Sequence, residues 1–231
     1  SETVGGNITG TGAITSGSGT ITVSGDFSNN ALFTAGTGTV NYNGNNQQVK
    51  GATYYNLTIS NGSAKTLQAA TSINRTLTLN SGILQIGNYD LYINYDNASA
   101  ITGAAFSSTN MIATDGSGFL YKNGTSPQTL YPVGSGTYYS PVTLVITSGG
   151  NAGTIYVRAV SSTSLGTGFI PKFWDIKTSF GGKTFTATFN YDPAEIIVTP
   201  STLWYKSPPG NWLTPSGVPT FGVNSFTITG T

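Results

Sequence analysis

The stretch that decides the fold reads Thr39-Val40-Asn41-Tyr42-Asn43-Gly44, and a related unit reads Asn56-Leu57-Thr58-Ile59-Ser60-Asn61. In both units apolar and polar side chains alternate before turn residues, which is typical of a strand with one buried face and one solvated face. Such units recur roughly every 14 to 20 residues through the first hundred residues. The other units are Thr20 to Gly25, Thr76 to Asn80, and Asp90 to Asn94.

This recurrence predicts a repeat architecture for residues 1–105. A coil of a β-solenoid needs about this much chain for two or three short strands and their corners. We therefore expect a right-handed parallel β-helix in this part. An antiparallel sandwich with long hairpins is the alternative, because it shows the same alternation. The scarcity of paired Asn-Gly or Asp-Gly hairpin turns favours the solenoid.

Residues 106–141 change character and read as a hairpin with a connecting segment. The run from Asn110 to Tyr121 has Asp115-Gly116 at its centre, a pair that favours a tight hairpin turn. Loop residues follow from Asn123 to Pro127, and Tyr131-Pro132-Val133-Gly134 leads into the next apolar strand.

Residues 142–231 have short strands at the spacing of an immunoglobulin-like β-sandwich. The alternative for the whole chain is therefore two sandwiches. The expected strands are Val142–Thr147, Gly153–Val160, Phe173–Thr178, Lys183–Tyr191, Ile196–Val198, Leu203–Lys206, Trp212–Thr214 and Ser225–Thr229. The large aromatic side chains expected in the core are Phe173, Trp174, Phe185, Phe189, Trp204 and Trp212.

Composition narrows the function classes. Charged residues make up 7% of the 231 residues and aromatic residues 12%, with a formal net charge of +1. Such a chain folds, because disorder normally needs high net charge and few aromatics. The near-zero net charge provides no basic surface of the kind that binds nucleic acid, and the apolar runs are too short to span a membrane.

We expect an extracellular or cell-surface location from the Thr, Ser, Asn and Gly surface. We also expect a mature or excised chain, since the first residues lack a secretion signal.

Two stretches resemble the repeat-rich surface proteins of Bacteroidota, including large adhesins exported by the type IX system. Residues 19–30, 38–44 and 54–59 are similar to the solenoid-like repeats of such proteins. Residues 131–134, 139–143, 173–176, 185–191, 203–206 and 211–212 are similar to the β-sandwich that often follows those repeats. The resemblance implies a secreted, surface-displayed and non-enzymatic module.

Catalytic groups are few. The chain has no His and no Cys, so nucleophilic triads and the usual zinc or iron sites are excluded, and we expect no cofactor. Paired carboxylates remain, and Asp90 with Asp96 and Asp192 with Glu195 are the nearest pairs in the sequence. We interpret these acids as turn residues that accept local backbone hydrogen bonds. Asp96-Asn97 and Asp115 offer oxygens to calcium, but no acidic loop with ligand spacing is present.

Several surface features are candidate sites. Asn-x-Ser/Thr triplets, which are glycosylation acceptors in a suitable host, occur at Asn7, Asn56, Asn61, Asn74, Asn97 and Asn123. Thr-x-Thr pairs such as Thr20 with Thr22 and Thr76 with Thr78 could order water and bind ice on a flat face, although Thr also simply suits an exposed strand. Tyrosines that could stack against sugar rings are Tyr54, Tyr55, Tyr92, Tyr95, Tyr138, Tyr139 and Tyr205.

These observations predict a structural and adhesive surface protein without catalytic activity. It would act as an adhesin module, or as the subunit of an extracellular filament whose partner is another copy of itself. Strand exchange through residues 3–22 or 225–231 would join the subunits. The alternative is a carbohydrate-binding module that uses exposed tyrosines, with glycans as partners. A polysaccharide-degrading enzyme and an ice-binding protein are further alternatives.

Overall fold

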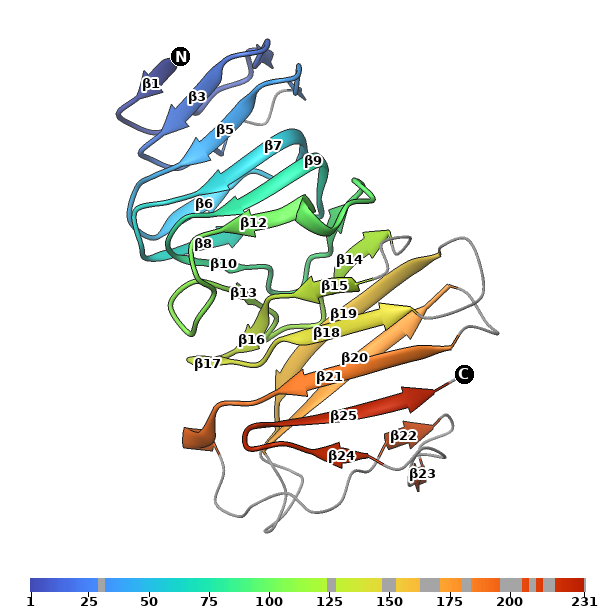
Figure 1. Cartoon of the computed structure of the whole chain (residues 1–231). Helices are drawn as coiled ribbons and strands as arrows, with labels where there is room; N and C mark the ends of the chain where they lie inside the picture. Colours follow the sequence, from blue (N-terminus) through green and yellow to red (C-terminus); the bar gives the residue numbers. More distant parts are fainter. Residues whose placement is uncertain are drawn as a thin grey trace.

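The structure is a computed structural model that describes residues 1–28, 32–123, 128–146, 153–162, 171–179, 184–195, 205–207, 211–213 and 219–230 (Figure 1). Nearly all regular structure in these residues is β-strand. The helical segments among them are two single 3-10 turns, η1 (Ala98–Ala100) and η2 (Pro193–Glu195). The all-β prediction is therefore confirmed.

The largest sheet begins with seven parallel strands, one from each successive turn of the chain. In order these strands are β1 (Glu2–Val4), β3 (Thr20–Val23), β5 (Thr39–Tyr42), β7 (Thr53–Ile59), β9 (Thr71–Leu79), β11 (Leu91–Ile93) and β14 (Leu120–Asn123). β12 (Ile101–Gly103) pairs with the second half of β9, while β11 pairs with its first half. Figure 1 shows these strands stacked from the blue N-terminal end to the green middle of the chain.

Between these strands the chain crosses to a second parallel sheet. Its strands are β6 (Gln47–Val49), β8 (Ala64–Leu67), β10 (Ile83–Gln85), β13 (Ile112–Ala113) and β16 (Val133–Ser135), with β17 (Tyr138–Tyr139) added antiparallel at the edge. A small third pairing joins β2 (Ile14–Thr15) to β4 (Phe33–Thr34). This alternation makes a β-solenoid of about seven turns, so the solenoid prediction is confirmed and the sandwich alternative for the first half is wrong.

Alternation within each unit fills the interior of the solenoid. Val40, Leu57 and Leu77 occupy neighbouring register positions and are buried, whereas Thr58 and Thr78 lie on the outer side of the same sheet. Close stacking of the coils also requires glycine at certain corners. A Cβ at Gly44 would lie 1.8 Å from the carbonyl oxygen of Ser24 in the preceding coil.

The hairpin expected around Asp115-Gly116 is wrong. β13 precedes this pair and β14 follows it, and the two strands lie in different sheets, each in parallel pairing with the coil before it. The Asp115 carboxylate instead accepts hydrogen bonds from the Ser135 hydroxyl at 2.7 Å and the Gly136 N–H at 2.6 Å. Asp-Gly therefore forms a corner of the solenoid that is tied to the following turn.

The remaining strands are antiparallel. β19 (Thr154–Ser161) pairs with β14 and then with β20 (Lys172–Thr178), which extends the large sheet. A five-stranded sheet runs in the order β15 (Gln128–Tyr131), β18 (Val142–Ile146), β21 (Phe185–Asn190), β25 (Ser225–Gly230) and β24 (Thr220–Phe221). A further pair joins β22 (Tyr205–Ser207) to β23 (Asn211–Leu213). The strand expected at Ile196–Val198 and the side chains of Trp204 and Trp212 lie outside the described residues.

An aromatic cluster joins the two antiparallel regions. The Trp174 ring on β20 lies 5.3 Å from that of Phe189 on β21 and 5.5 Å from that of Phe226 on β25, between ring centroids. Trp174 and Phe189 were both expected in the core, and Phe189 is buried. The extension of the large sheet therefore packs against the five-stranded sheet through these rings.

Candidate functional site

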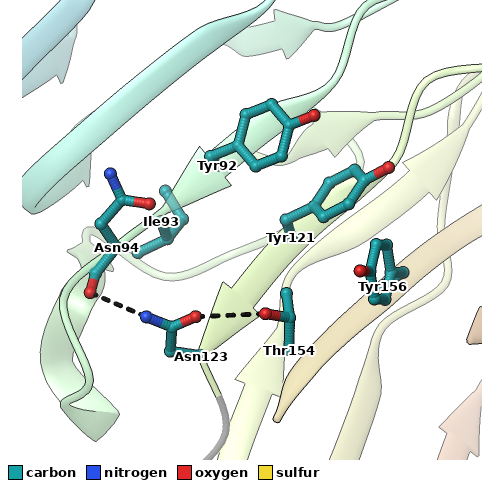
Figure 2. A pocket seen from close by; sticks show the side chains of 7 residues that line it. All are labelled: Tyr92, Ile93, Asn94, Tyr121, Asn123, Thr154 and Tyr156. Atoms are coloured by element: carbon teal, nitrogen blue, oxygen red, sulfur yellow. Dashed lines mark hydrogen bonds between the residues drawn. The ribbon is translucent and has the colours of Figure 1, made fainter. Parts of the chain in front are cut away.

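Three tyrosines form a continuous row on the outer face of the large sheet. Tyr92 lies opposite Tyr121 in the parallel register, and Tyr121 lies opposite Tyr156 in the antiparallel register. The ring centroids of Tyr92 and Tyr121 are 4.4 Å apart, and those of Tyr121 and Tyr156 are 4.2 Å apart. Figure 2 shows the three side chains projecting from neighbouring strands. We call these three residues the tyrosine row.

The local sequence places each tyrosine on the outer face. Tyr92 stands between the buried residues Leu91 and Ile93, and Tyr156 stands between the buried residues Ile155 and Val157. Because successive side chains of a strand point to opposite faces, the tyrosine between two buried positions must point outward. The row is half-buried by its own ring contacts, so each ring keeps part of its surface open to solvent.

A row of amide and hydroxyl groups runs beside the tyrosine row. The Asn123 side-chain amide donates a hydrogen bond to the carbonyl oxygen of Asn94 at 3.2 Å. The Thr154 hydroxyl donates to the Asn123 side-chain oxygen at 3.4 Å, as drawn in Figure 2. These groups and the tyrosine row line an open groove of about 370 Å³. Aromatic walls with a few fixed polar groups are typical of small-ligand and glycan sites.

Asp90 lies at the other side of the row and orders it. Its carboxylate accepts a hydrogen bond from the Tyr92 hydroxyl at 3.2 Å and from the Phe119 backbone N–H at 2.9 Å. Burial raises the pKa of both Tyr92 and Tyr121, and the Asp90 carboxylate raises both further. Both hydroxyls therefore remain protonated at neutral pH and can donate hydrogen bonds.

Cationic side chains cover Phe119, whose ring lies beside the row, 6.2 Å from that of Tyr121 and 6.5 Å from that of Tyr156. The Arg158 guanidinium lies 4.6 Å and the Lys177 ammonium 4.2 Å from the centroid of the Phe119 ring. Arg158 is held by an ion pair with Asp175 at 2.9 Å. These contacts keep Phe119 covered and leave the tyrosine row as the aromatic surface that faces the groove.

The structure divides the tyrosines singled out from the sequence. Tyr54 as a sugar-stacking residue is wrong, because its side chain is fully buried and its hydroxyl is 2.9 Å from that of Tyr42. Tyr55, Tyr138 and Tyr139 are half-buried on other strands. Tyr92 alone among the candidates belongs to the row. The partners Tyr121 and Tyr156 were missed, although each has the alternating pattern that identified Tyr92.

The glycosylation candidates are spread over the described surface. Asn7, Asn61 and Asn74 are exposed, whereas Asn56, Asn97 and Asn123 are half-buried. The Asn97 side chain accepts the Ser99 N–H at 2.8 Å and so caps η1. These positions remain predictions.

The acidic residues considered as pairs have other partners in the described part of the chain. Glu195 forms a buried ion pair with Lys172, and the Asp192 side chain accepts the Ala194 N–H at 2.9 Å, as turn chemistry predicts. Among the described residues, no three His, Cys, Asp or Glu side chains gather where they could hold a metal ion.

In comparison with known proteins, no family model, curated protein or solved structure matches the chain. No helix in the described ranges is long and apolar enough to cross a membrane.

Proposed function

We propose that this chain is a non-catalytic extracellular adhesive module that binds polysaccharide through the tyrosine row. The observation that carries the proposal is the contact of Tyr92, Tyr121 and Tyr156 on three adjacent strands, with amide and hydroxyl groups alongside. Its extracellular location and adhesive role also draw on the resemblance to surface proteins of Bacteroidota.

The length of the row favours a chain of sugars over a single sugar. Adjacent strands lie about 4.8 Å apart, so three strands present an aromatic surface about 10 Å long. The planes of Tyr92 and Tyr121 differ by 36°, and those of Tyr121 and Tyr156 by 64°. The surface is therefore twisted, and it suits a helical or twisted polysaccharide whose C–H faces pack on the rings while its hydroxyls bond to Asn123 and Thr154.

Affinity electrophoresis against a panel of soluble polysaccharides tests this proposal. We expect at least one polysaccharide to retard the wild-type chain, and Tyr121→Ala to weaken that retardation at least tenfold, because Tyr121 contacts both of its neighbours in the row. Tyr55→Ala is the matched control, since Tyr55 is a half-buried tyrosine of the same sheet outside the groove. Equal retardation of wild type and Tyr121→Ala by every binding polysaccharide would contradict the role of the row.

We propose as a second candidate that copies of the chain join end to end through β1. β1 is the first strand in the order of the large sheet and pairs on one side only, with β3, among the described residues. Glu2 and Thr3 are exposed. An unpaired strand edge is a template for a strand of another chain, so a second copy is the partner that this arrangement suits.

We further propose that the antiparallel strands after the solenoid form an immunoglobulin-like sandwich and that the solenoid coils are right-handed. The packing of Trp174 against Phe189 and Phe226 from the opposing sheet supports the sandwich. The strong preference of parallel crossovers for the right-handed sense supports the handedness.

A further inference from the structure

Lys172 and Glu195 form a contact that the proposed functions do not use. Lys172 is the first residue of β20, and Glu195 is the last residue of η2. The Lys172 Nζ lies 2.7 Å from Glu195 Oε1, and the side chains are 0% and 2% exposed. The second carboxylate oxygen, Oε2, is buried and has no hydrogen-bond partner among the described residues. A buried ion pair offsets the cost of desolvation only when the remaining charged atoms are also hydrogen-bonded, and Oε2 lacks such a bond.

The surroundings of the pair are low in water and hold the amine in place. The Lys172 Nζ also donates a hydrogen bond to the hydroxyl of Ser140, which is itself fully buried. The Tyr138 ring lies 5.5 Å from the Nζ. These contacts leave the amine with little freedom to move away from the carboxyl group.

Burial moves both groups toward their neutral forms. Desolvation lowers the pKa of Lys172 and raises the pKa of Glu195, although the pairing itself opposes both shifts. Transfer of one proton from Nζ to the carboxylate gives a neutral amine beside a neutral carboxylic acid with no change in net charge. A neutral, desolvated lysine amine is a nucleophile.

We propose that Lys172 and Glu195 condense to an intramolecular amide that cross-links β20 to η2. The Nζ lone pair attacks Cδ of the protonated Glu195 carboxyl, and a bond forms between Nζ and Cδ. One C–O bond of the carboxyl breaks, and its oxygen leaves as water with the acid proton and one Nζ proton. The reaction needs no oxidant and no other reactant.

Geometry and burial favour this reaction over the same reaction in solution. Two groups held in contact react with effective concentrations of about 10⁵ to 10⁸ M in well-oriented systems. The cross-link replaces two buried charges with an amide, which removes the cost of keeping them desolvated. Because the chain has no cysteine, it has no disulfide, and this amide would be a covalent tie between the large sheet and the segment that follows β21.

Intact-mass spectrometry of the purified, denatured full chain tests the cross-link. We expect the wild-type chain to be lighter than its sequence mass by the mass of one water. Lys172→Met should have the full mass of its own sequence. Lys65→Met is the matched control and should retain the deficit, because Lys65 is also buried but contacts the carbonyl oxygens of Ser60 and Gly62 rather than a carboxyl group.

Trypsin digestion of the wild-type chain locates the bond, and this measurement does not depend on the folding of any variant. An amide at Lys172 blocks cleavage there, so we expect a branched species in which residues 159–177 are joined to residues 184–206. Full sequence mass for the folded wild-type chain after prolonged incubation, with normal cleavage at Lys172, would overturn the proposal and leave an ordinary ion pair. A water deficit that persists in Lys172→Met would overturn it as well.

Discussion

The rings of Tyr121 and Tyr156 meet across the boundary where strand pairing changes from parallel to antiparallel, with centroids 4.2 Å apart. Tyr121 belongs to the last parallel strand of the large sheet, and Tyr156 belongs to the first antiparallel one. The tyrosine row therefore exists only because β19 pairs with β14. A binding surface at this boundary depends on the solenoid and the following strands together.

The carboxylate of Asp90 should support both stability and binding. We expect Asp90→Ala to lower the free energy of unfolding by about 1–3 kcal/mol, because the Phe119 N–H and the Tyr92 hydroxyl lose their acceptor. Urea denaturation measures the stability, and affinity electrophoresis measures the expected weaker binding. Asp90→Asn keeps an oxygen that can accept the Phe119 N–H and should recover most of the stability. If the alanine variant is as stable as the asparagine variant, these hydrogen bonds contribute nothing.

Close contact between coils should make Gly38 sensitive to substitution. A Cβ at Gly38 would lie 2.2 Å from the carbonyl oxygen of Gly19 in the preceding coil. We expect Gly38→Ala to destabilise the chain by about 1–3 kcal/mol, as overpacking does, and thermal denaturation checks this. Gly5→Ala is the matched control, because no atom lies within 4 Å of its Cβ position. Similar melting temperatures for the two variants would mean that the coils separate at little cost.

The buried Lys65 should make stability rise with pH above neutrality. Burial lowers the pKa of Lys65 from 10.5 to about 8, so between these values the unfolded chain binds a proton that the folded chain does not. Stability therefore increases with pH across this window, and below about pH 8 the cost of burying the charge is fully present. Urea midpoints at pH 7, 8 and 9.5 check this.

Lys65→Met isolates the contribution of this residue. The difference between the wild-type and variant free energies should move in favour of wild type as pH rises from 8 to 9.5. A difference that is constant over this range would show that Lys65 does not change its protonation on unfolding.

Substitution of Thr3 should show whether copies of the chain assemble through β1. The Val4 carbonyl accepts the Ser24 N–H at 2.9 Å, so Val4 faces β3. In a parallel pair successive residues direct their backbone groups to opposite sides, so Thr3 faces the open edge. Thr3→Pro removes a donor at that edge and retains the pairing with β3, since proline is tolerated on edge strands.

Electron microscopy and light scattering at increasing concentration measure this assembly. We expect wild type and Thr3→Val to form filaments and Thr3→Pro to remain monomeric with an unchanged melting temperature. Filaments of Thr3→Pro would exclude β1 as the joint, and monomers of wild type at every concentration would contradict the filament proposal.

Periodicity explains why the solenoid could be predicted. The units at Thr39 and Asn56 each bury alternate residues, and their recurrence indicated stacked coils. The same local reasoning was wrong at Asp115-Gly116, because a turn preference does not say which sheet the chain enters next. The Asp115 side chain bonds to Ser135 in the following turn, and that partner is invisible in the local sequence.

The candidate site residues, like the fold, were predicted only in part from the sequence. The sequence identified Tyr92 as outward-facing but placed Tyr54 with it, although Tyr54 fills the core beside Tyr42. Both tyrosines lie in strands with alternating apolar and polar residues. Alternation alone does not show which face of such a strand is buried, because the register with the neighbouring coils decides that. Glu195 was treated as a turn acid paired with Asp192, and only the fold brings it to Lys172.

The sequence by itself determined an all-β chain, a repeating first half and the absence of thiol and imidazole chemistry. These properties follow from composition and from period-two alternation, which are local. The tertiary structure alone decided which outward tyrosines meet, which corner replaces a hairpin, and which lysine is buried against a carboxyl group. Such contacts join residues in different coils or sheets, and their partners are set by register and packing across the whole molecule.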